Sequence, residues 1–401
     1  MRRAAAAALL FCAALSSYDD VPDQIDPDDC AAPQDALARS LAPQPGLPTV
    51  PHPPGNPPTA EKIALGRKLF FDRRLSINGT MSCAMCHVPE QGFANHEMQT
   101  AIGVEGRSGR RNAPTILNTG FLARLFHDGR DPALETQFLT PLLARHEMAN
   151  PSAGHVIALL NGLPDYRALF RDAFGAPASV DRMGMALAVW QRSLVAGDAP
   201  FDRWFYLGDD TALSEAQKRG HALFAGRAGC ASCHVIGESD ALFTDQMFHD
   251  TGYGWMRERQ RQRGTDVTRV QVAPGVYHDL GRDRLTRLAR PRAADLGRYE
   301  VTEDPADRWR FRTPSLRNVA VTRPYMHDGG LPDLAAVIAF YNDGGPGHPD
   351  QDARIAPLGL DARDMADLEA FLISLTSPDL PCLAAGARGQ PRRDHAGADE
   401  E

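Results

Sequence analysis

The sequence has no apolar run long enough to cross a bilayer and no basic stripe with interleaved aromatic residues. Its longest apolar stretch, residues 4–15, has twelve residues, whereas a membrane-spanning helix needs about 20. The net charge is −8, and acidic residues are mixed into the arginine-rich segment 257–298, which we predict to be a solvated loop. We therefore expect neither a membrane span nor a nucleic-acid partner.

The N-terminus has the pattern of an export signal. Arg2 and Arg3 precede the apolar residues 4–15, and a charged start followed by a short apolar run is typical of a secretory signal peptide. We predict that residues 1–17 are removed and that the mature protein is periplasmic.

Only seven cysteines are present. Cys12 falls in the predicted signal peptide and four others form two CxxC pairs, which leaves Cys30 and Cys382. In an oxidising compartment such a leftover pair can close a disulfide. Two free thiols are the alternative, and the sequence does not decide between them.

The central part of the chain contains an internal repeat. Residues 61–70 precede a CxxCH motif at 83–87, and the similar segment 215–224 precedes a second CxxCH at 230–234. The repeated unit is a helix, a loop and CxxCH. The two helices share three residues in the same register: Gly66, Leu69 and Phe70 against Gly220, Leu223 and Phe224.

Helices rather than strands are predicted for most of the remaining chain. The periodicity and the capping residues indicate helices that begin after Thr59 and Ser214, at 178–194, at 334–341, and from Asp361 to just before Pro378. The repeat predicts domains at 59–203 and 204–380, preceded by a Pro- and Asp-rich leader or wrap, 18–58, and followed by a disordered tail, 381–401.

The two CxxCH motifs predict two covalently attached haem c groups. Both thiols of such a motif add to the haem vinyl groups, and the histidine supplies the proximal nitrogen to iron. A zinc site is the alternative, but zinc does not require a histidine directly after each second cysteine. The predicted haem-binding residues are Cys83, Cys86, His87, Cys230, Cys233 and His234.

The sixth position of each iron decides between an electron carrier and an enzyme, and spacing alone does not identify it. A methionine at helical spacing is more often a core residue than a ligand. The candidates are His96, Met98, Met148, Met326, His327, Tyr341 and Met365.

The sequence closely resembles the bacterial di-haem cytochrome c peroxidase and MauG family over residues 58–378. The resemblance implies an all-α fold of two tandem cytochrome c-type domains whose haems face a shared interface. It rests on LGRKLFFDRRLS at 65–76, SCAMCH at 82–87, RNAPTILN at 111–118, HDGR at 127–130 and TPSLRNVAVTRPYMHDGG at 313–330.

The resemblance implies that the first haem is the peroxide site. Peroxidases of the family carry a blocking histidine in the loop that matches residues 102–107, and this loop has none; His96 lies earlier and does not match. The site therefore resembles the open one of the MauG branch. The family's distal glutamate and glutamine match Glu147 and Gln137, and such a glutamate can move a proton between the two peroxide oxygens.

At the second haem, the family has either a methionine or a tyrosine ligand, and Tyr341 occupies the matching position. A tyrosine packed in the core is the alternative interpretation. An anionic phenolate is expected to lower the haem potential, whereas methionine raises it.

The resemblance also implies a calcium ion, because Asn112, Thr322 and Pro324 match its oxygen ligands. Two residues depart from the family. His127 replaces a tryptophan between the haems, and Ala228 replaces the tryptophan through which MauG oxidises its protein substrate.

These observations favour a peroxidase that reduces hydrogen peroxide with electrons relayed through the second haem. The expected donor is a small cytochrome c, a cupredoxin or another reductant. One alternative is a MauG-like oxidase that modifies a partner protein; the other is a non-enzymatic di-haem electron carrier or redox sensor.

Overall fold

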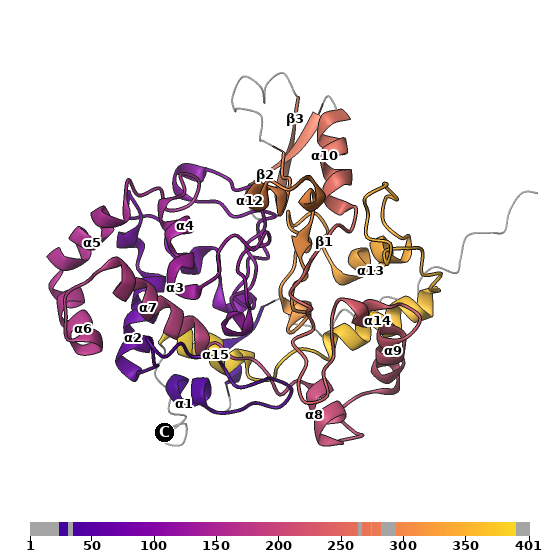
Figure 1. The fold of residues 1–401 in the computed structure, drawn as a ribbon, viewed down its shortest axis with the longest axis horizontal. Coiled ribbons are helices and arrows are strands. Elements are labelled where there is room, and N and C mark those ends of the chain that lie inside the picture. Colours follow the sequence, from indigo (N-terminus) through magenta and orange to yellow (C-terminus); the bar gives the residue numbers. More distant parts are fainter. Residues whose placement is uncertain (1–23, 31–34, 264–266, 274, 282–293, 390–401) are drawn as a thin grey trace, which may run out of the picture.

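The computed structural model describes residues 24–30, 35–263, 267–273, 275–281 and 294–389. The predicted signal peptide lies outside the described residues. Figure 1 shows the chain passing from a group of helices near the N-terminus to a second group nearer the C-terminus. Of the helices in the described ranges, none combines the length and the apolar character that crossing a membrane requires.

The first group of helices follows the leader. Thr59 caps the second helix of the chain by accepting a hydrogen bond from the Lys62 backbone N–H, as its sequence predicts. The helices are α1 (Ala36–Leu41), α2 (Ala60–Phe71), α3 (Leu134–Gln137), α4 (Leu139–Leu143), α5 (Ala153–Gly162), α6 (Pro164–Phe174) and α7 (Val180–Arg192).

The second group begins with a short helix after Ala199. Ser214 and Gln217 form a capping box at the start of the repeated helix in this half, which confirms the predicted start. The helices are α8 (Pro200–Leu207), α9 (Glu215–Ala225), α10 (Tyr253–Arg263), α12 (Tyr299–Thr302), α13 (Leu334–Asn342) and α14 (Ala362–Ile373). The last helix of the described residues, α15 (Leu380–Arg388), lies with the first group.

The shared glycines of the repeat explain its helix pairing. A Cβ atom on Gly66 would lie 2.1 Å from the Ala186 carbonyl oxygen, where α2 crosses α7. A Cβ atom on Gly220 would lie 1.9 Å from the Asp367 carbonyl oxygen, where α9 crosses α14. In both halves, the glycine therefore lets the helix that precedes CxxCH approach a later helix closely.

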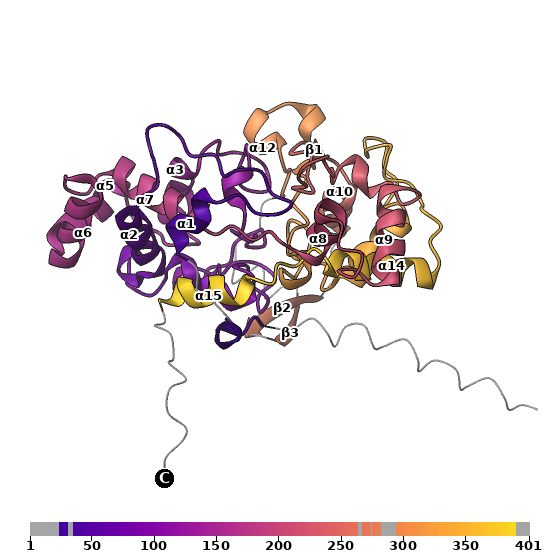
Figure 2. The same cartoon turned by 90° about the horizontal axis from the view of Figure 1, so that it is seen from below.

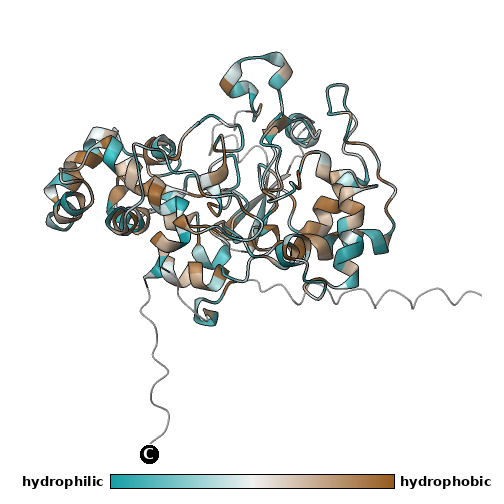
Figure 3. Cartoon of the chain, turned by 60° about the horizontal axis from the view of Figure 1, so that its bottom comes forward, coloured by the Kyte–Doolittle hydropathy of each residue, from teal (hydrophilic) through white to brown (hydrophobic). Residues whose placement is uncertain are grey.

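Each group of helices has its own hydrophobic core. Hydrophobic and hydrophilic residues follow one another along the helices (Figure 3). The division into two cytochrome c-type domains remains a prediction. The larger cores include Leu65, Phe70, Tyr166 and Trp190 in the first group, and Phe201, Phe224, Phe243 and Phe371 in the second.

The fold is helix-rich, but the all-α prediction is wrong in detail because the described residues include two small antiparallel sheets. Strand β1 (Phe248–His249) pairs with β4 (Phe311–Arg312), and β2 (Val267–Ala273) forms a hairpin with β3 (Val276–Gly281). The segment 257–298 is accordingly not a simple loop, because α10 and the hairpin occupy much of it. Strand β2 contains three valines and a threonine, which are residues that favour a strand.

The prediction of a disordered tail from residue 381 is also wrong as far as residue 389. Helix α15 buries Leu383, Ala384 and Ala387 against the first core, and Figure 2 shows it lying beneath α2. Residues 390–401 lie outside the described residues. The chain therefore returns from its second half to its first.

A disulfide joins Cys30 to Cys382, which decides between the two alternatives for the leftover cysteines in favour of pairing. The bond attaches the leader to α15 across a sequence separation of 352 residues. The described part of the leader is only partly extended, because it includes the 3₁₀ helix η1 (Pro27–Asp29) and α1. Its Leu47 and Val50 are buried in a small hydrophobic cluster with Phe121 and Val195.

Candidate functional site

The first CxxCH motif holds its histidine in a half-buried position. Cys83 begins the 3₁₀ helix η3 (Cys83–Met85), and His87 Nδ1 lies 3.2 Å from the Phe93 carbonyl oxygen. If Nδ1 carries the proton, it donates to that carbonyl and leaves Nε2 to bind a metal. Burial lowers the pKa of His87, although the Phe93 and Pro114 carbonyls oppose this effect. A neutral imidazole is the form that binds iron.

The two thiols of this motif face the same buried region as Glu147. Burial, followed by the charges of Cys86 and Glu147, raises the pKa of Cys83 to about 12. Burial and the charge of Glu147 likewise raise the pKa of Cys86 to about 12. The two sulfurs are neutral thiols and are not joined in a disulfide.

Glu147 is half-buried, and burial raises its pKa despite the opposing charge of Arg130. The neighbouring His146 lies close to its carboxyl, with 3.6 Å between Nε2 and Oε1. A carboxyl with a raised pKa can both accept and return a proton. The structure thus places the predicted proton-transfer residue beside the first CxxCH motif.

The loop at 102–107 packs against the backbone of Glu147. The Val104 N–H donates to the Glu147 carbonyl at 2.9 Å, and the Gly103 N–H donates to the Arg107 carbonyl at 2.8 Å. A Cβ atom on Gly103 would lie 2.4 Å from the Glu147 carbonyl oxygen. The loop is therefore held close to the site, and it contributes no histidine, methionine or lysine side chain.

Gln137 and His96 have different positions relative to this site. Gln137 is the last residue of α3 and is half-buried; within the described part of the structure, no hydrogen bond joins it to Glu147. His96 Nε2 lies 2.7 Å from the Val321 carbonyl oxygen in the second half of the chain. His96 is therefore engaged with the second half of the chain.

The second CxxCH motif repeats the arrangement of the first. His234 Nδ1 lies 2.8 Å from the Phe243 carbonyl oxygen, and burial lowers the pKa of His234 against the effect of the Phe243 and Pro314 carbonyls. Tyr341 projects from α13 toward the same region. Burial, and then the charges of Cys230 and Cys233, raise the pKa of Tyr341 above its usual range.

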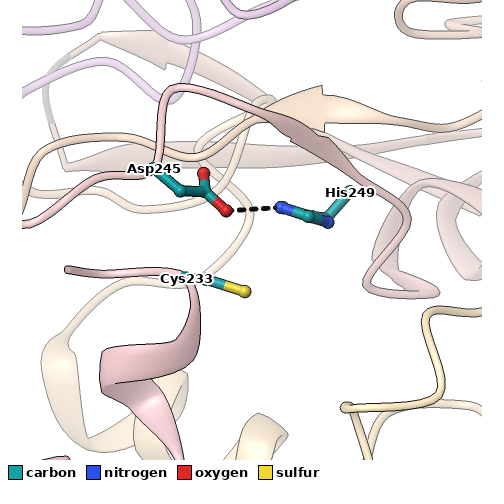
Figure 4. A group of neighbouring side chains, drawn as sticks. All are labelled: Cys233, Asp245 and His249. Carbon is teal, nitrogen blue, oxygen red and sulfur yellow. Dashed lines mark hydrogen bonds and ion pairs between the residues drawn. The ribbon is translucent and has the colours of Figure 1, made fainter.

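A polar cluster lies beside the second motif. Cys233, Asp245 and His249 bring their ligand atoms within 4.8 Å of one another (Figure 4). His249 Nε2 lies 2.8 Å from Asp245, and its Nδ1 lies 2.9 Å from Asp352. This group could hold a metal ion only if the Cys233 sulfur were free, whereas haem attachment would use that sulfur.

The two halves meet around two histidines at equivalent positions. His127 and His327 belong to HDGR and HDGG sequences, and both lie at the junction of the halves. The Arg312 N–H donates to the His127 carbonyl at 2.8 Å, and the Asn112 N–H donates to the His327 carbonyl at 2.9 Å. Burial and the charge of Arg111 lower the pKa of His127 to about 3, so its ring is neutral. His127 Nε2 lies 3.1 Å from the Asn112 carbonyl oxygen.

Two residues near this junction, Tyr253 and Asp328, were not identified from the sequence. Tyr253 donates a hydrogen bond to Asp328, and the neighbouring His327, a candidate iron ligand in the sequence, stacks on Phe311 with ring centroids 3.9 Å apart. The repetition of His-Asp-Gly at 127–129 and 327–329 was a signal that could have identified Asp328. Tyr253 had no comparable sequence signal.

The predicted calcium ligands lie in the same region. Asn112 Nδ2 donates to the Gln99 carbonyl at 3.2 Å. A Cβ atom on Gly329 would lie 2.2 Å from that carbonyl oxygen and 3.1 Å from Pro324 Cγ, so these groups are close neighbours. Thr322 ends the 3₁₀ helix η9 (Val319–Val321), two residues before Pro324.

The residues of both motifs fit covalent haem attachment. Each motif offers two neutral thiols and one half-buried, neutral imidazole whose Nδ1 is directed at a backbone carbonyl. The hydrogen bond to Nδ1 fixes the ring plane and directs Nε2 toward a metal. The two sites differ in their second polar group, which is Glu147 at the first and Tyr341 at the second.

Comparison with known proteins identifies the family of the chain. Residues 60–211 match the model of the family described as di-haem cytochrome c peroxidase. The chain is 40% identical to the methylamine utilization protein MauG of Methylorubrum extorquens, over 83% of this chain and 85% of that protein. It is 37% identical to a cytochrome-c peroxidase of Denitromonas iodatirespirans, over 87% and 90%. A solved MauG-like protein associated with microbial copper homeostasis superposes with a TM-score of 0.66 at 32% identity, over 85% of this chain and 95% of that one. The chain belongs to the di-haem cytochrome c peroxidase family.

Proposed function

We propose that the protein is a periplasmic peroxidase that reduces hydrogen peroxide beside its first CxxCH motif and receives electrons through its second. Membership of the family supports the peroxidase activity and the haem cofactors. The N-terminal signal pattern and the Cys30–Cys382 disulfide support an oxidising compartment outside the cytoplasm.

At the first site, His87 would hold the haem iron and Glu147 would handle the protons. The haem supplies the redox chemistry of peroxide reduction when bound. Glu147 takes a proton from the peroxide oxygen nearer the iron and returns one to the departing oxygen, because its raised pKa suits both steps. We propose that Gln137 orients the peroxide, because it matches the distal glutamine of the family.

At the second site, His234 and Tyr341 would hold the haem iron. The position of Tyr341 near both thiols of the motif supports this assignment. A phenolate ligand disfavours reduction of the iron, which suits a site that retains oxidising equivalents. A small cytochrome c or a cupredoxin is the proposed donor.

A calcium ion held by Asn112, Thr322 and Pro324 is a further part of the proposal, supported by the closeness of Asn112 and Pro324 to Gln99.

The observation that carries the proposal is the loop at 102–107, which packs on Glu147 and has no side chain able to ligate iron. The test is rapid mixing of the fully ferric holoprotein with hydrogen peroxide, followed by absorbance. We expect an immediate change in the haem bands without any reductant. A requirement for prior reduction would contradict an open first site.

A MauG-like oxidase is the second candidate, and Tyr341 favours it. Ala228 and His127 weigh against it, because they occupy the two positions at which the family carries tryptophans. Ala228 is also buried. Incubation with peroxide and candidate proteins, followed by mass spectrometry, separates the two functions. A non-enzymatic carrier predicts two six-coordinate irons, which ferric electron paramagnetic resonance (EPR) spectra would reveal.

A further inference from the structure

A line of aromatic rings leads from the second CxxCH motif to the junction of the two halves. The ring centroids of Tyr341 and Phe340 are 5.3 Å apart, and those of Phe340 and Tyr253 are 5.6 Å apart. Tyr253 is followed by His327 at 5.7 Å, and His327 by Phe311 at 3.9 Å. Phenylalanine and neutral histidine rings are hard to oxidise. Tyr253 is therefore the oxidisable ring in the middle of this line.

Tyr253 also has a base placed for its proton. Its hydroxyl donates to Asp328 Oδ1 at 3.0 Å, and Arg257 Nε donates to Asp328 Oδ2 at 2.7 Å. The tyrosine is 2% exposed, so water does not compete for the hydroxyl. Burial and the charge of Asp328 raise the pKa of Tyr253 above its usual range, so the phenol keeps its proton at rest.

The turn that carries Asp328 is shaped around this hydroxyl. The Gly330 N–H donates to Asp328 Oδ1 at 2.9 Å and orients the carboxylate. A Cβ atom on Gly330 would lie 2.1 Å from the Tyr253 hydroxyl oxygen. Any larger residue at position 330 would therefore displace the tyrosine from its acceptor.

The equivalent turn in the first half is built differently. Asp128 accepts from Arg111 at 2.6 Å and from Arg130 at 3.0 Å, so two guanidinium groups occupy its oxygens instead of a phenol. The chain has another buried tyrosine–carboxylate pair, Tyr166 with Asp72 at 2.8 Å. The Tyr166 ring contacts Phe170 within the first core and lies outside the ring line. This pair provides a matched control.

We propose that Tyr253 is a redox-active tyrosine that supplies an electron to the second haem site during peroxide reduction and passes its proton to Asp328. This rests on the proposed peroxidase function. Reduction of hydrogen peroxide to two waters takes two electrons and two protons. Tyr253 provides one electron, the haem centres provide the other, and solvent provides the protons. The phenolic proton moves to Asp328 and leaves a neutral tyrosyl radical. Two electrons from an external one-electron donor later restore Tyr253 and the haem centres, and the proton returns from Asp328 to the phenol.

This role suits a chain in which His127 replaces the tryptophan between the haems. An imidazole with a strongly lowered pKa offers no easily oxidised ring at that position. The Tyr253–Asp328 pair would provide an oxidisable ring beside His327, which also lies at the junction of the two halves.

The test is freeze-quench EPR of the ferric holoprotein after hydrogen peroxide is added without reductant. We expect a tyrosyl radical in the wild type, its loss in Tyr253→Phe, and its retention in Tyr166→Phe. Asp328→Asn keeps an oxygen that accepts the hydrogen bond but takes no proton, so the radical should form more slowly or not at all. Haem spectra and thermal unfolding verify that each variant is folded and loaded.

Peroxide consumption is measured in the same samples. Consumption without a tyrosyl signal, or a signal that persists in Tyr253→Phe, overturns this inference and leaves the peroxidase function standing. No consumption by the wild type overturns the proposed function and this inference with it.

Discussion

Glu147 illustrates how one residue acquires its function from its surroundings. The side chain lies beside the thiols of the first motif, while its carbonyl is held by the Val104 N–H. Replacing the carboxyl by an amide changes the proton chemistry and keeps the size and the backbone contacts. The residue can therefore be tested without disturbing the loop at 102–107.

We predict that Glu147→Gln slows peroxide cleavage by roughly 10²- to 10⁴-fold, the usual scale of general acid–base catalysis. The carboxylate must accept a proton first, so the wild-type rate should fall as pH falls through the pKa of Glu147. Because that pKa is raised, the fall should begin above the pH expected for an ordinary glutamate. The variant should lose this pH dependence, and stopped-flow rates across pH will measure both effects. An unchanged rate would remove Glu147 from the mechanism.

Tyr341 offers a second test at the scale of the residue. Tyr341→Phe should remove the ligand, and the low-spin signal of the second haem should change. Tyr341→Met should raise the potential of that haem, because thioether ligation favours the reduced iron. Ferric EPR and a redox titration are the measurements. A low-spin signal identical in Tyr341→Phe and the wild type would show that the tyrosine is a core residue.

Single residues also show the limit of sequence reasoning. The CxxCH motifs carry their chemistry in consecutive residues, so their proximal histidines are predictable from the motif itself. The Tyr253–Asp328 contact joins residues 75 positions apart, and nothing in the local sequence pairs them. The local pattern shows which residues can react, whereas the fold shows which of them meet.

At the scale of the element, the repeated helices depend on a glycine at each crossing. Gly66 allows α2 to touch the backbone of α7, and Gly220 does the same for α9 on α14. Helix starts were predictable because their caps are local, as at Thr59 and Ser214. The β2–β3 hairpin and α15 were not predicted, since the segments around them are rich in charged, proline or glycine residues. Burial against distant parts of the chain decides the fold of α15.

We predict that Gly66→Ala destabilises the protein by about 1–3 kcal/mol, the usual cost of overpacking a tight contact. The new Cβ atom would meet a backbone oxygen that cannot move aside. Gly154→Ala, near the start of α5, is the control. Its Cβ atom would meet only the Ser152 hydroxyl at 3.8 Å, and alanine favours the helix. Chemical denaturation of the holoproteins should show a loss for the first variant and none for the second.

At the scale of the whole molecule, the two ends of the chain are held together on the first half. Helix α15 packs there, and the Cys30–Cys382 bond fixes the leader to it. We predict that Cys382→Ser lowers the free energy of unfolding by roughly 2–4 kcal/mol, the usual contribution of a disulfide. Thermal and chemical unfolding will measure the loss, and haem content should be unchanged. A variant as stable as the wild type would show that helix packing alone holds the ends.

The junction of the two halves depends on a partly buried ionic network around Arg111. Its guanidinium donates to Asp128 at 2.6 Å in the first half and to Asp295 at 2.7 Å in the second. Burial tends to raise the pKa of each carboxyl, but hydrogen bonds and the charge of Arg111 outweigh it and hold both pKa values below their usual range. Both carboxylates are therefore more easily protonated in the unfolded chain than in the folded one.

This difference fixes the direction of the acid response. A carboxyl with a lowered pKa contributes stability above its unfolded pKa, near 3.8, and that stability is lost as pH falls toward the folded pKa. We expect the free energy of unfolding to decrease once the pH is lower than about 4. We also expect Arg111→Met to destabilise the protein by roughly 3–5 kcal/mol at neutral pH, because it leaves buried carboxylates without their partner. Arg203→Met removes an exposed pair with Asp198 and should cost less than about 1 kcal/mol. Denaturation curves from pH 7 to pH 3 are the measurement. If Arg111→Met shows the same acid-induced loss as the wild type, the acid sensitivity arises elsewhere and the network does not control the junction.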